Sequence, residues 1–233
     1  MLKIGTFDLE ERPAIVAAIS NEPLQQCKTA AEHGADILEI RFDLLGITTS
    51  KEAANLLRML KGTTSLPCIA TNRLQSQGGN WEGTEENRIA LLEDIMHLTD
   101  AVDIELETDE QLRDRIVKKA KEESKTTIIS SHDFERTPDK ETLKSILDHS
   151  HDAGADIAKL AVMPENMQDV LNLLEVTLEV DDVCTISMGK LGKHTRIIAP
   201  LYGSKLTYAS VSDAVAPGQL KVEDLKKAME MME

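Results

Sequence analysis

A lysine lies in the middle of the apolar segment 155–162, whose sequence is ADIAKLAV. Burying an ammonium group without a partner is costly, so the position of Lys159 requires an explanation. In one explanation, Lys159 is a structural counter-ion for interior carboxylates. In the other, desolvation and neighbouring cations favour its neutral amine, the form that attacks a carbonyl carbon. The segment alone leaves both explanations open.

Nucleophilic chemistry of this kind needs a proton-transfer partner, and the segment SSHDF at 130–134 offers one. Histidine exchanges protons near neutral pH. Side chains alternate between the two faces of a strand, so His132 is expected to close its strand on the pocket side. A single histidine is more often structural, and that reading also stays open.

Two later segments contain residues that can bind an anion or a polar ligand. The segment TISMGKLGKHTR at 185–196 passes from a strand into a glycine-bearing loop and ends at Arg196, which can bind a carboxylate with two hydrogen bonds. In SVSDAVAPGQL at 210–220, a Pro-Gly turn precedes Gln219, which can hydrogen-bond to a polar ligand. The simpler alternative is that both segments are ordinary loops.

Strand and helix patterns alternate along the chain and must position these residues. Apolar, β-rich runs recur at 13–20, 36–43, 66–73, 101–107, 126–133, 155–162, 182–188 and 205–211. The segments between them have helical period, for example at Ala53, Leu56, Leu57 and Leu60, and at Met167, Val170, Leu171, Leu174 and Leu178. The pattern predicts a (β/α)8 TIM barrel formed by residues 1–233 as a single domain. A doubly wound open sheet is the alternative, although no G-x-G-x-x-G follows the first strand.

Strand alternation also predicts which side chains line the barrel. One face of each of three strands is charged and the other is apolar. The charged sets are Glu39, Arg41 and Asp43, then Asp103, Glu105 and Glu107, and then Lys159. Active sites of this fold lie at the carboxyl ends of the strands, where the sequence places Arg41, Arg73, His132 and Ser187. Interior ion pairs that only hold the barrel together are the alternative, above all for Asp103, Glu105 and Glu107.

Composition narrows the class of partner. The chain carries 41 acidic and 26 basic residues, a formal charge of −15, which disfavours nucleic acid and anionic membranes as partners. The three cysteines have no CxxC spacing, which disfavours a disulfide or zinc framework. No run reaches the length of a membrane span and the first residues lack the layout of a signal peptide, so we expect a cytoplasmic protein.

Taken together, these segments resemble the type I 3-dehydroquinate dehydratases, the Schiff-base dehydratases of the shikimate pathway of aromatic amino acid biosynthesis. The likeness covers nearly the whole chain. Its motifs, in the order of the family, are EIRFD at 39–43, TNR with Gly78 and Gly79, SSHDF at 130–134, AKLAVM at 158–163, SMG at 187–189, HTRI, and APGQ at 216–219. Each motif is weak alone, but the ordered set is specific.

The resemblance implies the roles of individual residues. Lys159 forms an imine with the C3 ketone of 3-dehydroquinate, and His132 removes the C2 proton and protonates the departing hydroxyl. Arg196 binds the substrate carboxylate. The other substrate-binding residues are Gln219, Glu39, Arg41 and Arg73, with Gln77, Ser187 and Met188 as supporting residues. It further implies that no cofactor or metal is needed, and that the protein is a homodimer. Apolar outer helices such as 220–233 are the candidate contact surfaces.

Two residues depart from the pattern of the family. Gln77 stands where a glutamate ordinarily precedes the Gly-Gly pair, and Val215 stands where a serine ordinarily precedes APGQ. The first change removes a carboxylate that would pair with the histidine, unless Glu82 or Glu85 supplies one. The alternatives to a dehydratase are another Schiff-base barrel of the class I aldolase type and a catalytically silent ligand-binding barrel.

Overall fold

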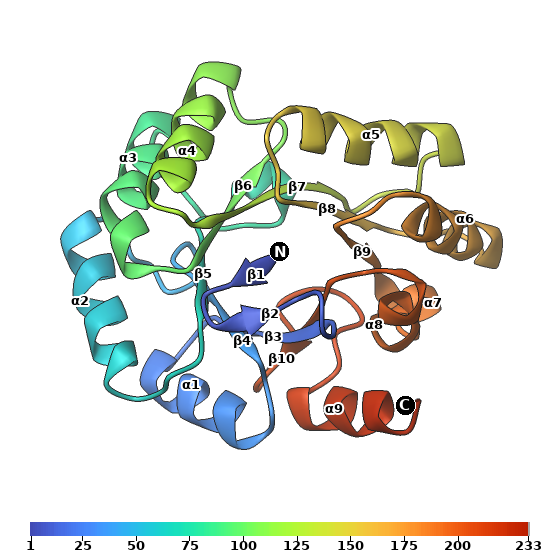
Figure 1. Ribbon diagram of the computed structural model, residues 1–233, viewed down its shortest axis with the longest axis horizontal. Coiled ribbons are helices and arrows are strands. Elements are labelled where there is room, and N and C mark those ends of the chain that lie inside the picture. The colour runs from blue at the N-terminus through green and yellow to red at the C-terminus, as the bar shows by residue number, and fades with distance from the viewer. Residues whose placement is uncertain (233) are drawn as a thin grey trace.

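Eight parallel strands form the centre of the computed structural model, which describes residues 1–232 (Figure 1). All eight strands predicted from the sequence are present. They are β3 (Ala14–Ile19), β4 (Ile37–Arg41), β5 (Cys68–Thr71), β6 (Ala101–Glu105), β7 (Thr126–Asp133), β8 (Ile157–Val162), β9 (Val183–Ser187) and β10 (Leu206–Ser210). Each strand from β3 to β8 pairs with the next one, and β10 pairs with β3.

The sheet curves until its two edge strands, β9 and β10, meet, which excludes the open-sheet alternative. Between β9 and β10, the backbone N–H of Lys205 donates to the carbonyl of Val183 over 2.7 Å. The backbone N–H of Thr185 donates to the hydroxyl of Ser204 over 3.2 Å. This seam carries few ladder bonds, and it closes the (β/α)8 barrel.

Helices surround the barrel as an outer ring (Figure 1). They are α1 (Pro23–Glu32), α2 (Ser50–Lys61), α3 (Glu85–Ile95), α4 (Glu110–Glu122), α5 (Lys140–Asp152), α6 (Met167–Glu179), α7 (Gly189–Gly192), α8 (Thr195–Ile198) and α9 (Val222–Glu230), with short 3-10 turns η1 (Gln75–Gln77), η2 (Met96–Leu98) and η3 (Ala199–Tyr202). Several begin at a side chain that accepts backbone N–H groups of the first turn, as Thr84 does for α3 and Asp109 for α4. Among residues 1–232, no helix is both long and apolar enough to span a membrane.

Helical period identified the buried face of α2 correctly and that of α6 only in part. Every one of the four apolar residues named for α2 is buried. On α6, in contrast, Met167, Leu171 and Leu178 are exposed, and the buried face contains Leu173 and Val176. The sequence of α6 is apolar on more than one side, so its period does not determine which side packs on β8 and β9.

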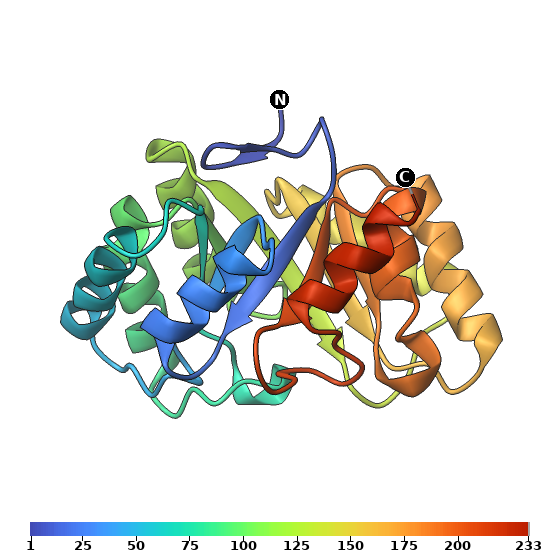
Figure 2. The same ribbon diagram turned by 90° about the horizontal axis from the view of Figure 1, so that it is seen from below.

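A hairpin that the sequence pattern did not reveal closes the amino-terminal end of the barrel (Figure 2). It consists of β1 (Lys3–Ile4) and β2 (Phe7–Asp8). The side chains of Ile4 and Leu9 are buried against inward-facing residues of the barrel strands. Strands of two residues are too short to show a period, which explains why they were missed. With this end filled, the functional cavity lies at the opposite end.

Candidate active site

One cavity at the carboxyl end of the barrel brings together most of the residues singled out from the sequence. Its lining residues are Glu39, Arg41, Arg73, Gln77, Gly78, His132, Phe134, Lys159, Ala161, Ile186, Met188, Arg196, Tyr208, Val215, Ala216 and Gln219. They come from five strands, β4, β7, β8, β9 and β10, and from the segments that follow β5, β7, β9 and β10. Local alternation along each strand therefore produced one shared pocket.

Lys159 points into the barrel from β8 and is surrounded by two carboxylates and a ring. Its Nζ donates to Oδ2 of Asp103 over 2.8 Å and lies 3.6 Å from Oε1 of Glu39. It also lies 4.1 Å from the centre of the Tyr208 ring, which supplies a cation–π contact. All four side chains are buried. The counter-ion reading of Lys159 thus describes its surroundings, and the pocket it faces leaves its amine accessible to a ligand.

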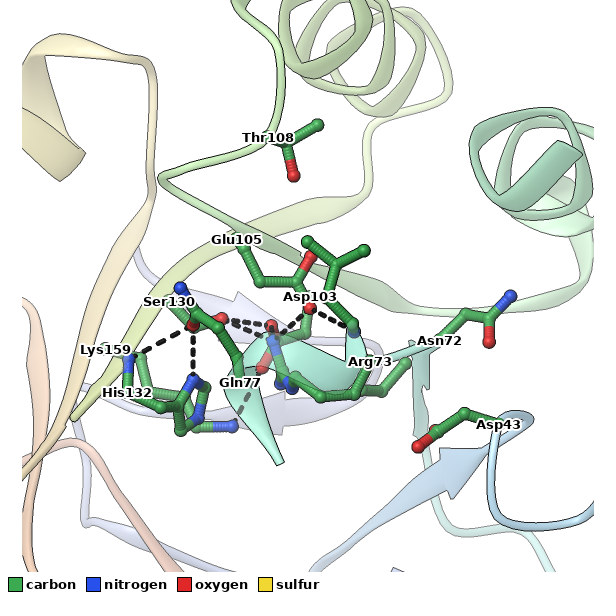
Figure 3. Close-up of polar contacts among 12 residues, drawn as sticks. Asp43, Asn72, Arg73, Gln77, Asp103, Glu105, Thr108, Ser130, His132 and Lys159 are labelled. Atoms are coloured by element: carbon green, nitrogen blue, oxygen red, sulfur yellow. Dashed lines mark hydrogen bonds and ion pairs between the residues drawn. The ribbon is translucent and has the colours of Figure 1, made fainter. Parts of the chain in front are cut away.

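Asp103 links Lys159 to Arg73 (Figure 3). Its Oδ1 lies 2.8 Å from Nη1 of Arg73 and accepts a 2.6 Å hydrogen bond from the hydroxyl of Ser130. Burial alone would raise the pKa of Asp103, but the positive charges of Arg73 and Lys159 hold it well below its usual range. Asp103 is therefore ionised at neutral pH and fixes the two cations on either side of it.

A second carboxylate extends this charge network behind the cavity. Oε1 of Glu105 accepts from Nη1 of Arg73 over 2.9 Å and from the backbone N–H of Leu74. Oε2 of Glu105 lies 2.7 Å from Nη1 of Arg88, an ion pair without hydrogen-bond alignment. Arg88 is fully buried and also binds Glu85 at the start of α3. The network confirms the ion-pair reading of Asp103 and Glu105.

His132 contacts Gln77 through two different atoms. Oε1 of Gln77 accepts from the backbone N–H of His132 over 3.1 Å and lies 2.9 Å from its Nδ1. Desolvation, followed by the charges of Arg73 and Lys159, lowers the pKa of His132 well below its ordinary value. The imidazole is therefore neutral at neutral pH and able to accept a proton.

Arg196 faces the cavity without a carboxylate partner in residues 1–232. Its guanidinium donates to the backbone carbonyls of Gly218, Tyr208 and Pro217. Burial lowers its pKa to about 10, so the group keeps its charge at neutral pH. A buried cation held only by neutral carbonyls is suited to an anionic ligand.

The remaining polar lining residues are anchored to their own loops. Oε1 of Gln219 accepts the backbone N–H groups of Val215 and Ala216, which leaves its amide NH2 group available as a donor. Arg41 forms a two-bond ion pair with Asp43, whose Oδ2 also accepts from the backbone of Asn80. Both contacts hold long polar side chains at the rim of the pocket.

Two residues that the sequence placed in the barrel interior or at its pocket, Ser187 and Glu107, do not line the cavity. Ser187 is buried but outside the cavity, packed against Gly192 and Thr195, because alternation along β9 turns Ile186 and Met188 inward instead. Glu107 is exposed because β6 ends at Glu105. Neither Glu82 nor Glu85 lines the cavity, so neither of them replaces the carboxylate missing at Gln77.

Sequence reasoning missed Tyr208, Ser130 and Phe134. Tyr208 lies under the Lys159 amine, and its buried hydroxyl has no hydrogen-bond partner in the described residues. The signal was available, because residues two apart in a strand share a face. Ser130 therefore shares the face of His132 in β7, and Tyr208 shares the face of Leu206 in KLTYASV. Phe134 follows the strand, and its ring lies nearly parallel to that of His132 with 6.3 Å between the centroids.

Comparisons with known proteins agree with this geometry. Residues 14–233 match the model of the type I 3-dehydroquinase family. The 3-dehydroquinate dehydratase of Methanosarcina acetivorans is 54% identical over the full length of both chains. The crystal structure of 3-dehydroquinate dehydratase from Geobacillus kaustophilus superposes with a TM-score of 0.91 at 30% identity, covering 99% of this chain and 95% of that one. A type I enzyme from Clostridium difficile, solved with covalently modified comenic acid, gives a TM-score of 0.89 at 31% identity, covering 95% of this chain and 92% of that one. The chain therefore belongs to the type I 3-dehydroquinase family.

Proposed function

We propose that this chain removes water from 3-dehydroquinate to give 3-dehydroshikimate, through an imine formed by Lys159. The observation that carries the proposal is the buried pocket in which the Lys159 amine, the neutral His132 ring and the unpaired charge of Arg196 face one ligand volume. Membership in the type I 3-dehydroquinase family supports it. That membership also removes the aldolase-type reading.

In the proposed reaction, the amine of Lys159 condenses with the C3 ketone and releases one water molecule. The resulting iminium accepts the electron pair that the C2–H bond leaves behind, so the C2 proton becomes acidic. His132 takes this proton and then donates it to the C1 hydroxyl, which departs as water in a syn elimination. A second water molecule hydrolyses the imine and restores the amine. The lysine itself supplies the electron sink.

The other lining residues bind and orient the substrate in this proposal. Arg196 binds the carboxylate, since its guanidinium has neutral carbonyl partners. Gln219 donates its free amide to the polar end of the ring. Hydroxyl groups of the substrate are placed by Glu39, Arg41 and Arg73. Met188 completes the apolar wall and Gln77 supports His132.

We further propose that residues 1–233 act as one barrel domain, in the cytoplasm, as a homodimer. The three cysteines are free thiols, which fits a reducing compartment. A net charge of −15 argues against a nucleic-acid partner. In the segment 220–232, the side chains of Met231 and Met232 are exposed and available to a second copy. Light scattering coupled to gel filtration tests the oligomeric state.

Trapping of the imine tests the proposed chemistry directly. The protein is incubated with 3-dehydroquinate and borohydride, and intact-mass and peptide-mapping spectra locate the reduced adduct. We expect one adduct, on Lys159. Lys159→Ala is expected to fold, to give no adduct and to have no turnover. His132→Ala is expected to form the adduct while turning over far more slowly.

Three results would contradict the proposed chemistry. A folded wild-type protein that forms no adduct is a silent binding barrel or acts on another carbonyl compound. Substantial turnover by Lys159→Ala refutes the imine mechanism. Full activity of His132→Ala assigns the proton transfer to another group.

A further inference from the structure

Gln77 has two contacts with His132, and the first determines how its amide is turned. The backbone N–H of His132 is always a donor, and the Gln77 atom that faces it over 3.1 Å is Oε1. The opposite orientation would place two donors against each other. Gln77 is also 2% exposed, so water does not compete for this position. The carbonyl oxygen of the amide is therefore the atom that faces His132.

The second contact then determines which ring nitrogen of His132 carries the proton. The same Oε1 lies 2.9 Å from Nδ1, and an amide oxygen can only accept a hydrogen bond. Nδ1 must therefore be the donor. A neutral imidazole has a single N–H, so Nε2 is left with its lone pair.

The loop that carries Gln77 is built for a close approach to this strand. Gly78 has a φ of +75°, and a Cβ there would lie 2.4 Å from the Phe134 ring. A Cβ on Gly79 would lie 2.0 Å from the carbonyl oxygen of Arg73. Gly78 therefore allows η1 to pack against the end of β7, and Gly79 allows the loop to pass close to Arg73. In this arrangement the Gln77 amide contacts His132.

We propose that Gln77 is a positioning residue that holds His132 as the Nδ1–H tautomer, so that Nε2 is the atom that exchanges protons with the substrate. This inference rests on the proposed dehydratase function only for the role of Nε2 in turnover. The tautomer itself is a property of the resting protein. A neutral amide fixes the orientation of the ring without adding the negative charge that would stabilise an imidazolium.

The charges around His132 come from four strands and their ends. Arg41 on β4, Arg73 after β5 and Lys159 on β8 all disfavour the imidazolium, whereas Asp103 on β6 favours it. Glu39 and Arg196 also line the cavity. A carboxylate at position 77 would contact Nδ1 directly, and we expect it to outweigh the influence of any one of these groups.

The first test is nitrogen-15 NMR of resting protein labelled at histidine, at pH 8 and without substrate. The chain has six histidines, and the signals missing from His132→Ala identify those of His132. We expect a neutral ring with a protonated Nδ1 and a bare Nε2. A protonated Nε2, or a doubly protonated ring, overturns the proposal whether or not the protein is a dehydratase.

The second test compares variants at position 77. Gln77→Leu removes the hydrogen-bond acceptor, so we expect His132 in this variant to populate more than one tautomer. We expect kcat to fall about tenfold, as for the loss of one hydrogen bond, while the borohydride adduct still forms. Gln77→Glu is expected to move the acidic limb of the kcat/KM profile to higher pH by about one unit or more, because a protonated His132 cannot act as the base. Gln111→Glu, which adds the same charge at an exposed site on α4, is the control and should leave the profile unchanged. An acidic limb that stays in place in Gln77→Glu, or an intact tautomer in Gln77→Leu, refutes the assigned role of Gln77.

Discussion

Arg88 is expected to be one of the most stabilising side chains outside the cavity. It is completely buried and connects three elements. Its guanidinium donates to the carbonyl of Asn72 over 2.7 Å and to the hydroxyl of Thr108 over 3.0 Å, and it forms ion pairs with Glu85 and Glu105. The substitution Arg88→Met keeps most of the apolar volume and removes all of these contacts.

The expected loss follows from what the substitution leaves behind. Oε2 of Glu105 would remain buried without a counter-ion, whereas Oε1 would keep Arg73 and the backbone of Leu74. Removing one partner of a buried ion pair lowers the free energy of unfolding by about 3–5 kcal/mol. Because Glu105 retains its other contacts, we expect Arg88→Met to lower it by about 3 kcal/mol. For a urea slope of about 2–3 kcal/mol/M, the unfolding midpoint should fall by about 1 M or more.

The assay is urea unfolding followed by circular dichroism and by tryptophan fluorescence. Arg115→Met is the matched control, because Arg115 also bridges two acidic residues but its side chain is 42% exposed. We expect the control to change the midpoint very little. Adding Glu105→Gln to Arg88→Met should recover part of the lost stability, since the stranded charge is then absent. If Arg88→Met behaves like the Arg115→Met control, the buried network does not stabilise the barrel as argued.

Two further predictions concern Arg196 and the three cysteines. Arg196→Met should lower kcat/KM by about 10- to 100-fold through a higher KM, because it removes a charged hydrogen bond to the substrate carboxylate. An unchanged kcat/KM would rule out this role of Arg196. At pH 8, the three thiols should not react with a disulfide reagent in the folded protein, whereas all three should react in urea. The reason is that burial raises each cysteine pKa to about 12, and the reactive thiolate forms only as the pH approaches that value. Rapid labelling of the folded protein would contradict this prediction. The cysteines are Cys27, Cys68 and Cys184.

Strand alternation predicted the cavity well where it was applied consistently. Glu39, Arg41 and Lys159 point inward as expected, and the apolar residues between them face the helices. Ser187 was assigned to the site from its position at a strand end, although alternation turns its side chain away from the pocket. Arg88 was not singled out, yet it shares the buried face of α3 with Ile95, and a charge on such a face is a signal that can be read from sequence.

The sequence by itself determined the order of strands and helices and the direction of most side chains, because both follow from periods of two and of about 3.6 residues that are local to each element. Only the tertiary structure decided which partners these side chains have. Gln77 and His132 are 55 residues apart, and Lys159 and Asp103 are 56 residues apart. Their contacts depend on the register between strands and on how closely the glycine-bearing loop packs against β7. For the same reason, the absence of a carboxylate beside Arg196 in the described chain became visible only once all surrounding strands were in place.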